Sequence, residues 1–119
     1  MLEYDINGKR YQFNAGFSFI KNSNERKQDQ AGNNIGLLWC MAGIVDRDVE
    51  RLRDVLLDMN SGRTPRVTEQ EIEEWLESHE DIEKVFAEVA DFFEKANCTR
   101  EPWNKLSVLV KLAKETKKG

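Results

Sequence analysis

The stretch LEYDINGKRYQF, residues 2–13, decides how the chain begins to fold. At its centre, Asn7-Gly8 favours a two-residue hairpin loop, because both loop positions require a positive φ. A loop at this point pairs the flanking residues across two strands: Leu2 with Phe13, Glu3 with Gln12, Tyr4 with Tyr11 and Asp5 with Arg10. One face of the hairpin is then apolar and aromatic, and the other carries an opposite-charge pair. Cross-strand pairs of these kinds stabilise a hairpin.

Two strands alone are marginal in water, so the next segment is expected to cover the apolar face of the hairpin. Residues 15–21 favour a short helix, with Phe13, Phe17 and Ile20 at helical spacing. A third short strand over residues 17–20 is the alternative. Residues 22–34 are polar and lack apolar periodicity, which predicts a mobile loop.

The middle of the chain predicts two consecutive helices. Residues 35–45 are apolar on every side, so a helix there is expected to be buried all round. Its two glycines, Gly36 and Gly43, weaken the helix but permit close packing. Asp46 is the expected cap of the next helix, whose apolar face consists of Val49, Leu52, Val55, Leu56 and Met59.

Three further helices are predicted towards the C-terminus. Thr68 and Glu71 form a capping box. The helix that it opens points Ile72, Trp75, Leu76 and His79 inwards. A second helix begins between Ser78 and Asp81, with a broad apolar stripe of Ile82, Val85, Phe86, Val89, Phe92, Phe93 and Ala96. The last helix spans roughly residues 103–114, with Leu106, Leu109, Val110 and Ala113 on one face and Val108 and Leu112 off that face.

Length and composition place these elements in one small domain. The chain has 119 residues, of which 39% are hydrophobic and 34% charged, so both wholesale disorder and a membrane protein are disfavoured. The expected fold is mostly α with a short N-terminal β-hairpin (α+β) and about five to six helices. Within the single domain 1–119, residues 1–14 form the hairpin, 15–97 the helical core and 98–119 a C-terminal basic helix or tail.

The apolar run 35–45 is too short to span a bilayer, which takes roughly 20 residues, and lies too far into the chain for a signal peptide. We therefore expect a soluble, unexported protein without membrane association. Cys40 and Cys98 belong to no Cys-x-x-Cys pattern, so two reduced thiols are favoured over a disulfide.

Charge is distributed unevenly over the second half of the chain. Residues 69–94 contain eleven acids and one lysine, whereas residues 95–118 contain seven bases and two acids. We favour the interpretation that these are solvated helix faces that attract each other. The alternative is an electrostatic guide for a partner or for weak self-association.

Residues that could support catalysis are sparse. The one histidine, His79, lies at an apolar-face position typical of packing or capping. One histidine and two distant cysteines cannot assemble a zinc site with plausible spacing. The acidic segment 69–94 argues against a nucleic-acid reader, which needs basic side chains for the phosphates. The sequence therefore predicts no catalytic, cofactor or metal site.

A binding surface is the remaining function class. Tryptophan is enriched at the centres of interfaces, but Trp39 and Trp75 are expected in the core. The apolar stripe of the last helix is wider than docking against one surface requires. We therefore expect a partner-binding surface formed by Trp103, Leu106, Val108, Leu109 and Leu112.

Several segments together resemble a known family. The opening EYDINGKRYQFNAGFSFIK, the apolar helix followed by residues 46–59, and VTEQEIEEWLE followed by the acidic EDIEKVF are similar to the tail assembly chaperones of long-tailed bacteriophages, particularly those of Gram-positive hosts. The order and spacing of the segments carry the resemblance, which covers roughly residues 3–97.

The resemblance implies a non-enzymatic assembly factor in the host bacterial cytoplasm that is absent from the mature virion. Such chaperones bind the tape measure protein, keep it soluble and help to recruit tail tube subunits. The alternative is a small helical adaptor or regulator that binds another protein and is unrelated to phage. An enzyme ranks third.

Overall fold

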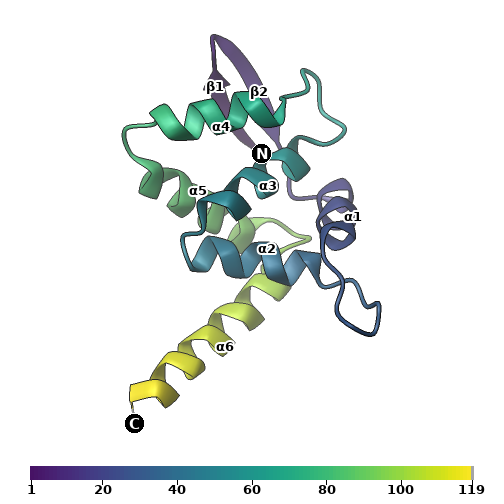
Figure 1. Cartoon of the computed structure of the whole chain (residues 1–119), viewed down its shortest axis with the longest axis vertical. Helices are drawn as coiled ribbons and strands as arrows, with labels where there is room; N and C mark the ends of the chain where they lie inside the picture. Colours follow the sequence, from purple (N-terminus) through teal and green to yellow (C-terminus); the bar gives the residue numbers. More distant parts are fainter. Residues whose placement is uncertain (119) are drawn as a thin grey trace.

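The computed structural model describes the backbone of residues 1–118 and the side chains of residues 1–113. A two-stranded antiparallel hairpin precedes six helices within these residues (Figure 1). The elements are β1 (Leu2–Ile6), β2 (Lys9–Phe13), α1 (Phe17–Arg26), α2 (Gly36–Val45), α3 (Val49–Asn60), α4 (Glu69–Ser78), α5 (Ile82–Lys95) and α6 (Arg100–Lys118). The predicted fold class, mostly helical with an N-terminal hairpin, is confirmed. Gly119, the last residue of the predicted segment 98–119, lies outside the described residues.

The hairpin has the predicted register, with Tyr4 opposite Tyr11 and Asp5 opposite Arg10. Asn7 and Gly8 have φ values of 53° and 80°, as the tight loop requires. The Arg10 guanidinium donates to Asp5 at 3.3 Å and to Glu3 at 2.7 Å on the solvent face. The apolar face packs against α3 and α4, so this face of the hairpin is part of the core.

Residues 17–20 are helical, which excludes the alternative of a third strand. Helix α1 is longer than predicted and takes in the first residues of the segment expected to be a mobile loop. The face of α1 that packs on the body also differs from the prediction, which placed Phe17 there. Phe19 is fully buried instead, whereas Phe17 is 83% exposed. Arg26 fixes the far end of the helix, because its guanidinium donates twice to the buried carboxylate of Asp58 in α3, at 2.7 and 2.9 Å.

Helix α2 is not buried all round, contrary to the prediction. Cys40, Met41 and Ile44 are inaccessible, but Leu38 is 50% exposed. The uniformly hydrophobic sequence overestimated the burial of α2, because the helix packs on α1, α3, α5 and α6 and one strip of it is still exposed to solvent. Close packing at its start is confirmed, since a Cβ on Gly36 would collide with the Ser23 carbonyl of α1.

The predicted cap of α3 is wrong by two residues. Asp48, not Asp46, accepts the backbone N–H groups of Glu50 and Arg51 at 3.0 and 3.3 Å. Asp46 instead closes α2, its N–H donating to the Ala42 carbonyl. Between the two aspartates, Arg47 adopts φ 59°, and this left-handed residue turns the chain before α3 begins.

Helix α3 lies at the centre of the fold and packs against α1, α2, α4 and β2. Its last residue, Asn60, is fully buried and joins three segments by hydrogen bonds. The side-chain amide donates to the carbonyls of Gln12 and Pro65, and its oxygen accepts the Val67 N–H at 2.8 Å. Asn60 thereby satisfies backbone groups that burial would otherwise leave without partners.

The predicted capping box of α4 is confirmed. Thr68 Oγ1 accepts the Glu71 N–H at 3.1 Å, and Glu71 accepts the Thr68 N–H at 3.0 Å. Glu71 also accepts the Tyr11 hydroxyl at 2.9 Å, which ties the helix start to the hairpin. The Thr68 backbone bond and then the Tyr11 hydroxyl hold the pKa of Glu71 below its usual value.

Candidate functional site

Helix α6 docks on the body through its first half. Trp103 is 8% exposed, and its ring centroid lies 5.5 Å from that of Phe93 in α5. Leu106 and Val110 continue this inner face and are partly covered, with α2 and α5 as the packing partners. Fully buried Thr99 fixes the junction, because its hydroxyl donates to the Phe93 carbonyl at 2.8 Å.

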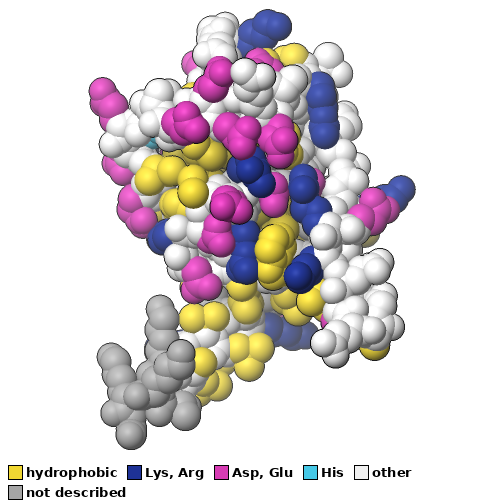
Figure 2. Space-filling view, viewed as in Figure 1, with side chains coloured by type: hydrophobic (Ala, Val, Ile, Leu, Met, Phe, Trp, Pro, Cys, Tyr) yellow, Lys and Arg dark blue, Asp and Glu magenta, His cyan; other side chains and the backbone are white. Residues whose placement is uncertain are grey.

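The outer face of α6 presents apolar side chains to solvent. Val108, Leu109 and Leu112 are 59%, 63% and 52% exposed, and we call these three residues the apolar ridge. Exposed Lys105 and Lys111 lie on the same stretch of helix. Figure 2 shows hydrophobic side chains along α6, where the helix projects from the body, and acidic side chains gathered over α4 and α5. A contiguous exposed apolar surface of this kind is typical of an interaction site.

The five residues predicted to bind a partner therefore separate into two groups. Trp103 is a buried core residue and Leu106 is partly buried, so these two anchor the helix. Val108, Leu109 and Leu112 are the members that solvent reaches. The predicted phase of the helix also needs correction, because Leu109 and Ala113 were expected on the inner face and are exposed.

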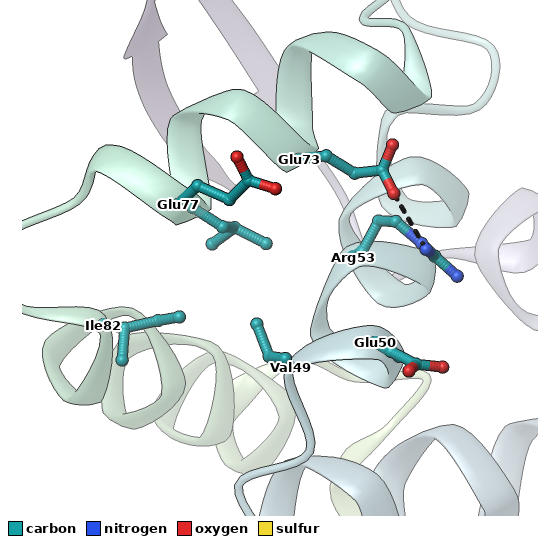
Figure 3. A pocket seen from close by; sticks show the side chains of 7 residues that line it. Val49, Glu50, Arg53, Glu73, Glu77 and Ile82 are labelled. Carbon is teal, nitrogen blue, oxygen red and sulfur yellow. Dashed lines mark hydrogen bonds and ion pairs between the residues drawn. The ribbon is translucent and has the colours of Figure 1, made fainter.

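A second surface feature lies between α3, α4 and α5. Val49, Leu76 and Ile82 form the apolar floor of a pocket of about 340 Å³, and Glu50, Arg53, Glu73 and Glu77 surround it. We call it the acidic pocket. Figure 3 shows Val49 and Ile82 pointing towards each other across the gap, with Glu73 and Glu77 of α4 on one side. In Figure 2 this region is a hydrophobic patch with acidic side chains around it.

The one cation on the rim of the acidic pocket is already paired. Arg53 donates to Glu73 at 3.1 Å and to Asp54 at 3.2 Å, and it lies 3.6 Å from Glu69. The rim thus keeps a net negative charge. Sequence reasoning missed this pocket because its three apolar residues come from three separate elements and form no local pattern. The only indication was the density of acids over residues 69–94.

The histidine and the cysteines are the side chains best able to take part in catalysis, but their surroundings are those of structural residues. The predicted inward position of His79 places its ring edge-on to Trp75, and its Nδ1 accepts the Asp81 N–H at 3.0 Å, as in a local cap between α4 and α5. Burial, followed by nearby Asp58 and Asp54, raises the pKa of Cys40 to about 12, so its thiol stays protonated at neutral pH. Cys40 and Cys98 are both free thiols, as predicted.

Among the described residues, no cluster of histidine, cysteine and acidic side chains could hold a metal ion. Nor does any described helix combine the length and apolar character needed to cross a bilayer. Two surface features of the described residues have a distinct chemistry, the apolar ridge and the acidic pocket.

A family model described as phage tail assembly chaperone protein matches residues 3–107 of the chain. The chain belongs to this chaperone family. The match covers the hairpin, all of α1 to α5 and the docked first half of α6, so it reaches further than the predicted resemblance over residues 3–97. The acidic pocket lies wholly within the matched chaperone segment, and the apolar ridge follows directly after it.

Comparison with curated proteins gives no match, and comparison with solved structures gives none either. The family match alone thus gives the chain its functional class, a chaperone of phage tail assembly.

Proposed function

We propose that this chain binds the tape measure protein during tail assembly, keeps it soluble and helps to recruit tail tube subunits. It acts in the host bacterial cytoplasm, is absent from the mature virion and catalyses no reaction. Family membership supports the chaperone role and disfavours an adaptor unrelated to phage. The observation that carries the assignment of a client surface is the apolar ridge on a helix that projects from the body.

The chemistry of the ridge suits a long helical client. An amphipathic helix must cover its apolar face to stay in solution, and a second amphipathic helix provides a matching strip. Val108 and Leu109 supply the apolar contact, while Lys105 and Lys111 keep the complex hydrated at its edges. A long client offers many such stretches, so several copies can bind along it and together cover its apolar surface.

Co-expression with the tape measure protein of the same phage tests this proposal. The full chain should raise the soluble fraction of the tape measure protein, and Leu109→Asp should abolish that gain, because a charge in the ridge opposes apolar contact. The matched control is Phe17→Asp, which places the same charge at an apolar position that is 83% exposed but lies on α1.

Two further measurements complete the test. Circular dichroism of both variants should match the wild-type chain, so that loss of function is not loss of fold. Pull-down of tail tube subunits by the soluble complex tests recruitment. If the tape measure protein is equally insoluble with and without the wild-type chain, the proposed client is wrong.

A further inference from the structure

We propose that the outer edge of β1 binds an extended segment of another protein in which basic and apolar residues alternate. The segment adds a strand to the hairpin, so that backbone hydrogen bonds supply affinity and alternate side chains supply specificity. We call this surface the β1 edge. It consists of the backbone groups of Glu3 and Asp5 that face away from β2. Binding there is additional to the proposed client contact, which uses the apolar ridge of α6.

The register of the hairpin decides which backbone groups face outwards. Ile6 and Lys9 close the two-residue loop, and in such a hairpin the closing pair is hydrogen-bonded. Along an antiparallel ladder, bonded pairs alternate with unbonded ones. Glu3 and Asp5 belong to unbonded pairs, so their N–H and C=O groups point away from β2. The groups of Gln12, opposite Glu3, point away from β1 in the same way.

Only one of the two outer edges of the hairpin is closed. On the β2 side, the Asn60 side-chain amide donates to the Gln12 carbonyl at 2.9 Å, and the Asn14 N–H donates to the Met59 carbonyl at 2.8 Å. The end of α3 thus covers the β2 edge. Within the described residues, no hydrogen bond reaches the outward backbone groups of β1. A row of unpaired N–H and C=O groups is a template for another strand.

The solvent face of the β1 edge favours a basic partner. The side chains of Glu3 and Asp5 both lie on this face, and that of Asp5 is 67% exposed. Arg10 contacts both carboxylates from β2, at 2.7 and 3.3 Å. One cation between two carboxylates leaves a net negative charge on the pair. Lysine or arginine on the neighbouring strand supplies the opposite charge that stabilises such a cross-strand contact.

The core face of the β1 edge favours an apolar partner. Leu2 and Tyr4 are half-buried on this face, and the Tyr4 ring lies 5.0 Å from the half-buried ring of Trp75. Apolar side chains on an added strand extend the cover of these residues. Burial, followed by the nearby charge of Glu88, raises the pKa of Tyr4, which places a third acid close to β1. Successive residues of a strand point to opposite faces, so the matching segment alternates basic and apolar residues.

The charges of β1 disfavour a second copy of the chain as the occupant. Antiparallel pairing of two β1 strands through their outer edges places Glu3 of each copy opposite Asp5 of the other. Like charges directly opposite each other destabilise a strand pair. The occupant is therefore a segment of a different protein with the opposite charge.

Backbone hydrogen exchange followed by NMR tests the proposal on the full chain, with a short peptide of alternating lysine and valine as the probe. The amides of Glu3 and Asp5 should exchange rapidly in the free chain. An excess of peptide should slow them by about tenfold or more, because each amide gains a backbone partner. The amides of Tyr4 and Ile6 are bonded within the hairpin and should change less.

Two control peptides separate strand addition from general attraction to acids. One has the same composition but carries its lysines grouped at one end, so that alternation is lost. The other alternates glutamate and valine, so that alternation is kept and the charge is reversed. Both should leave the amides of Glu3 and Asp5 unprotected, because the first cannot match both faces of the edge and the second meets like charge.

Variants of the chain separate the backbone contribution from the charge. Glu3→Pro and Glu3→Val both remove the carboxylate, but only proline removes the outward N–H, and it costs no bond of the hairpin. Peptide affinity, measured by calorimetry, should therefore fall further in Glu3→Pro. Asp5→Lys should weaken binding by about tenfold or more, whereas the matched control Glu94→Lys, at an exposed position of α5, should not. Circular dichroism checks that each variant is folded.

Three outcomes overturn the proposal. The first is the absence of protection at Glu3 and Asp5 in excess peptide, and the second is equal protection by either control peptide. The third is protection that rises with the concentration of the chain alone, which assigns the edge to a second copy. Leu109→Asp should bind the peptide like the wild-type chain, because its β1 edge is intact. Failure of the β1 edge and failure of the proposed client contact are therefore distinguishable.

Discussion

Helices α5 and α6 follow each other in the chain, and both are amphipathic, yet their apolar side chains have different surroundings. In α5, Val85, Val89 and Phe93 are fully buried. In α6, Trp103 is buried but Val108 and Leu109 are more than half exposed. The first helix is built into the core along its length, and the second is docked by one end (Figure 1).

The difference separates two uses of apolar surface. Burial of a large apolar side chain stabilises the fold by about 1.5–3 kcal/mol, whereas an exposed one contributes little until a partner covers it. Exposed Val108 and Leu109 of α6 therefore add little to folding and offer apolar surface to a partner. Substitutions along the two helices should show this as a gradient of stability effects.

The largest effect is expected at the centre of the α5 face. Phe93 contacts Phe19 on one side and Trp103 on the other, both at 5.5 Å between ring centroids. Phe93→Ala should lower the free energy of unfolding by about 3–5 kcal/mol, because a cavity remains where the ring was. Urea unfolding followed by circular dichroism measures the change. Phe17→Ala, at an exposed position, is the reference. If Phe93→Ala lost no more stability than Phe17→Ala, the contrast between buried and exposed apolar side chains would be contradicted.

The docked end of α6 should come next. Trp103→Ala should cost about 3 kcal/mol, the lower end for removal of a large aromatic side chain, because Trp103 lies at the margin of the core and is 8% exposed. Trp103→Phe retains an aromatic contact with Phe93 and should cost distinctly less. Equal unfolding midpoints for Trp103→Ala and the wild-type chain would show that α6 is not docked.

The docking of α6 also marks the limit of what could be predicted from sequence. Its residues offer two overlapping stripes, one through Leu109 and Ala113 and one through Trp103, Leu106 and Val110. The two stripes are similarly apolar, so periodicity alone cannot choose between them. The contact of Trp103 with Phe93 sets the phase, and that contact exists only once the chain has folded.

Where the determinants were local, prediction succeeded. Asn7-Gly8 fixed every cross-strand pair of the hairpin, and Thr68 with Glu71 fixed the start of α4. The start of α3 was missed because it depends on Arg47 in a left-handed conformation. The Arg47 guanidinium bonds the Ile44 carbonyl at 2.8 Å and Glu83 of α5 at 2.8 Å, a distant partner that no local pattern reveals.

The junction between α5 and α6 should give a smaller effect. Thr99→Val keeps the shape of the side chain but removes the hydroxyl that donates to the Phe93 carbonyl. Because that carbonyl then loses a buried partner, stability should fall by about 1–3 kcal/mol. Thr99→Ser retains the hydroxyl and should recover part of the loss. If Thr99→Val and Thr99→Ser were equally stable, the hydrogen bond would not be what secures the junction.

The smallest effect on stability is expected at the ridge, which is also where binding should be most sensitive. Leu109→Asp should change the free energy of unfolding by no more than about 0.5 kcal/mol, as is usual for an exposed site. The same variant should fail to solubilise the tape measure protein. If the ridge serves a partner, urea unfolding should show the largest loss of stability at Phe93, then Trp103, and the smallest at Leu109. Co-expression should show a loss of client solubility at Leu109 that its small effect on stability cannot explain. A large loss of stability at Leu109 would mean that its side chain already has an intramolecular contact, and the contrast between α5 and α6 would then fail.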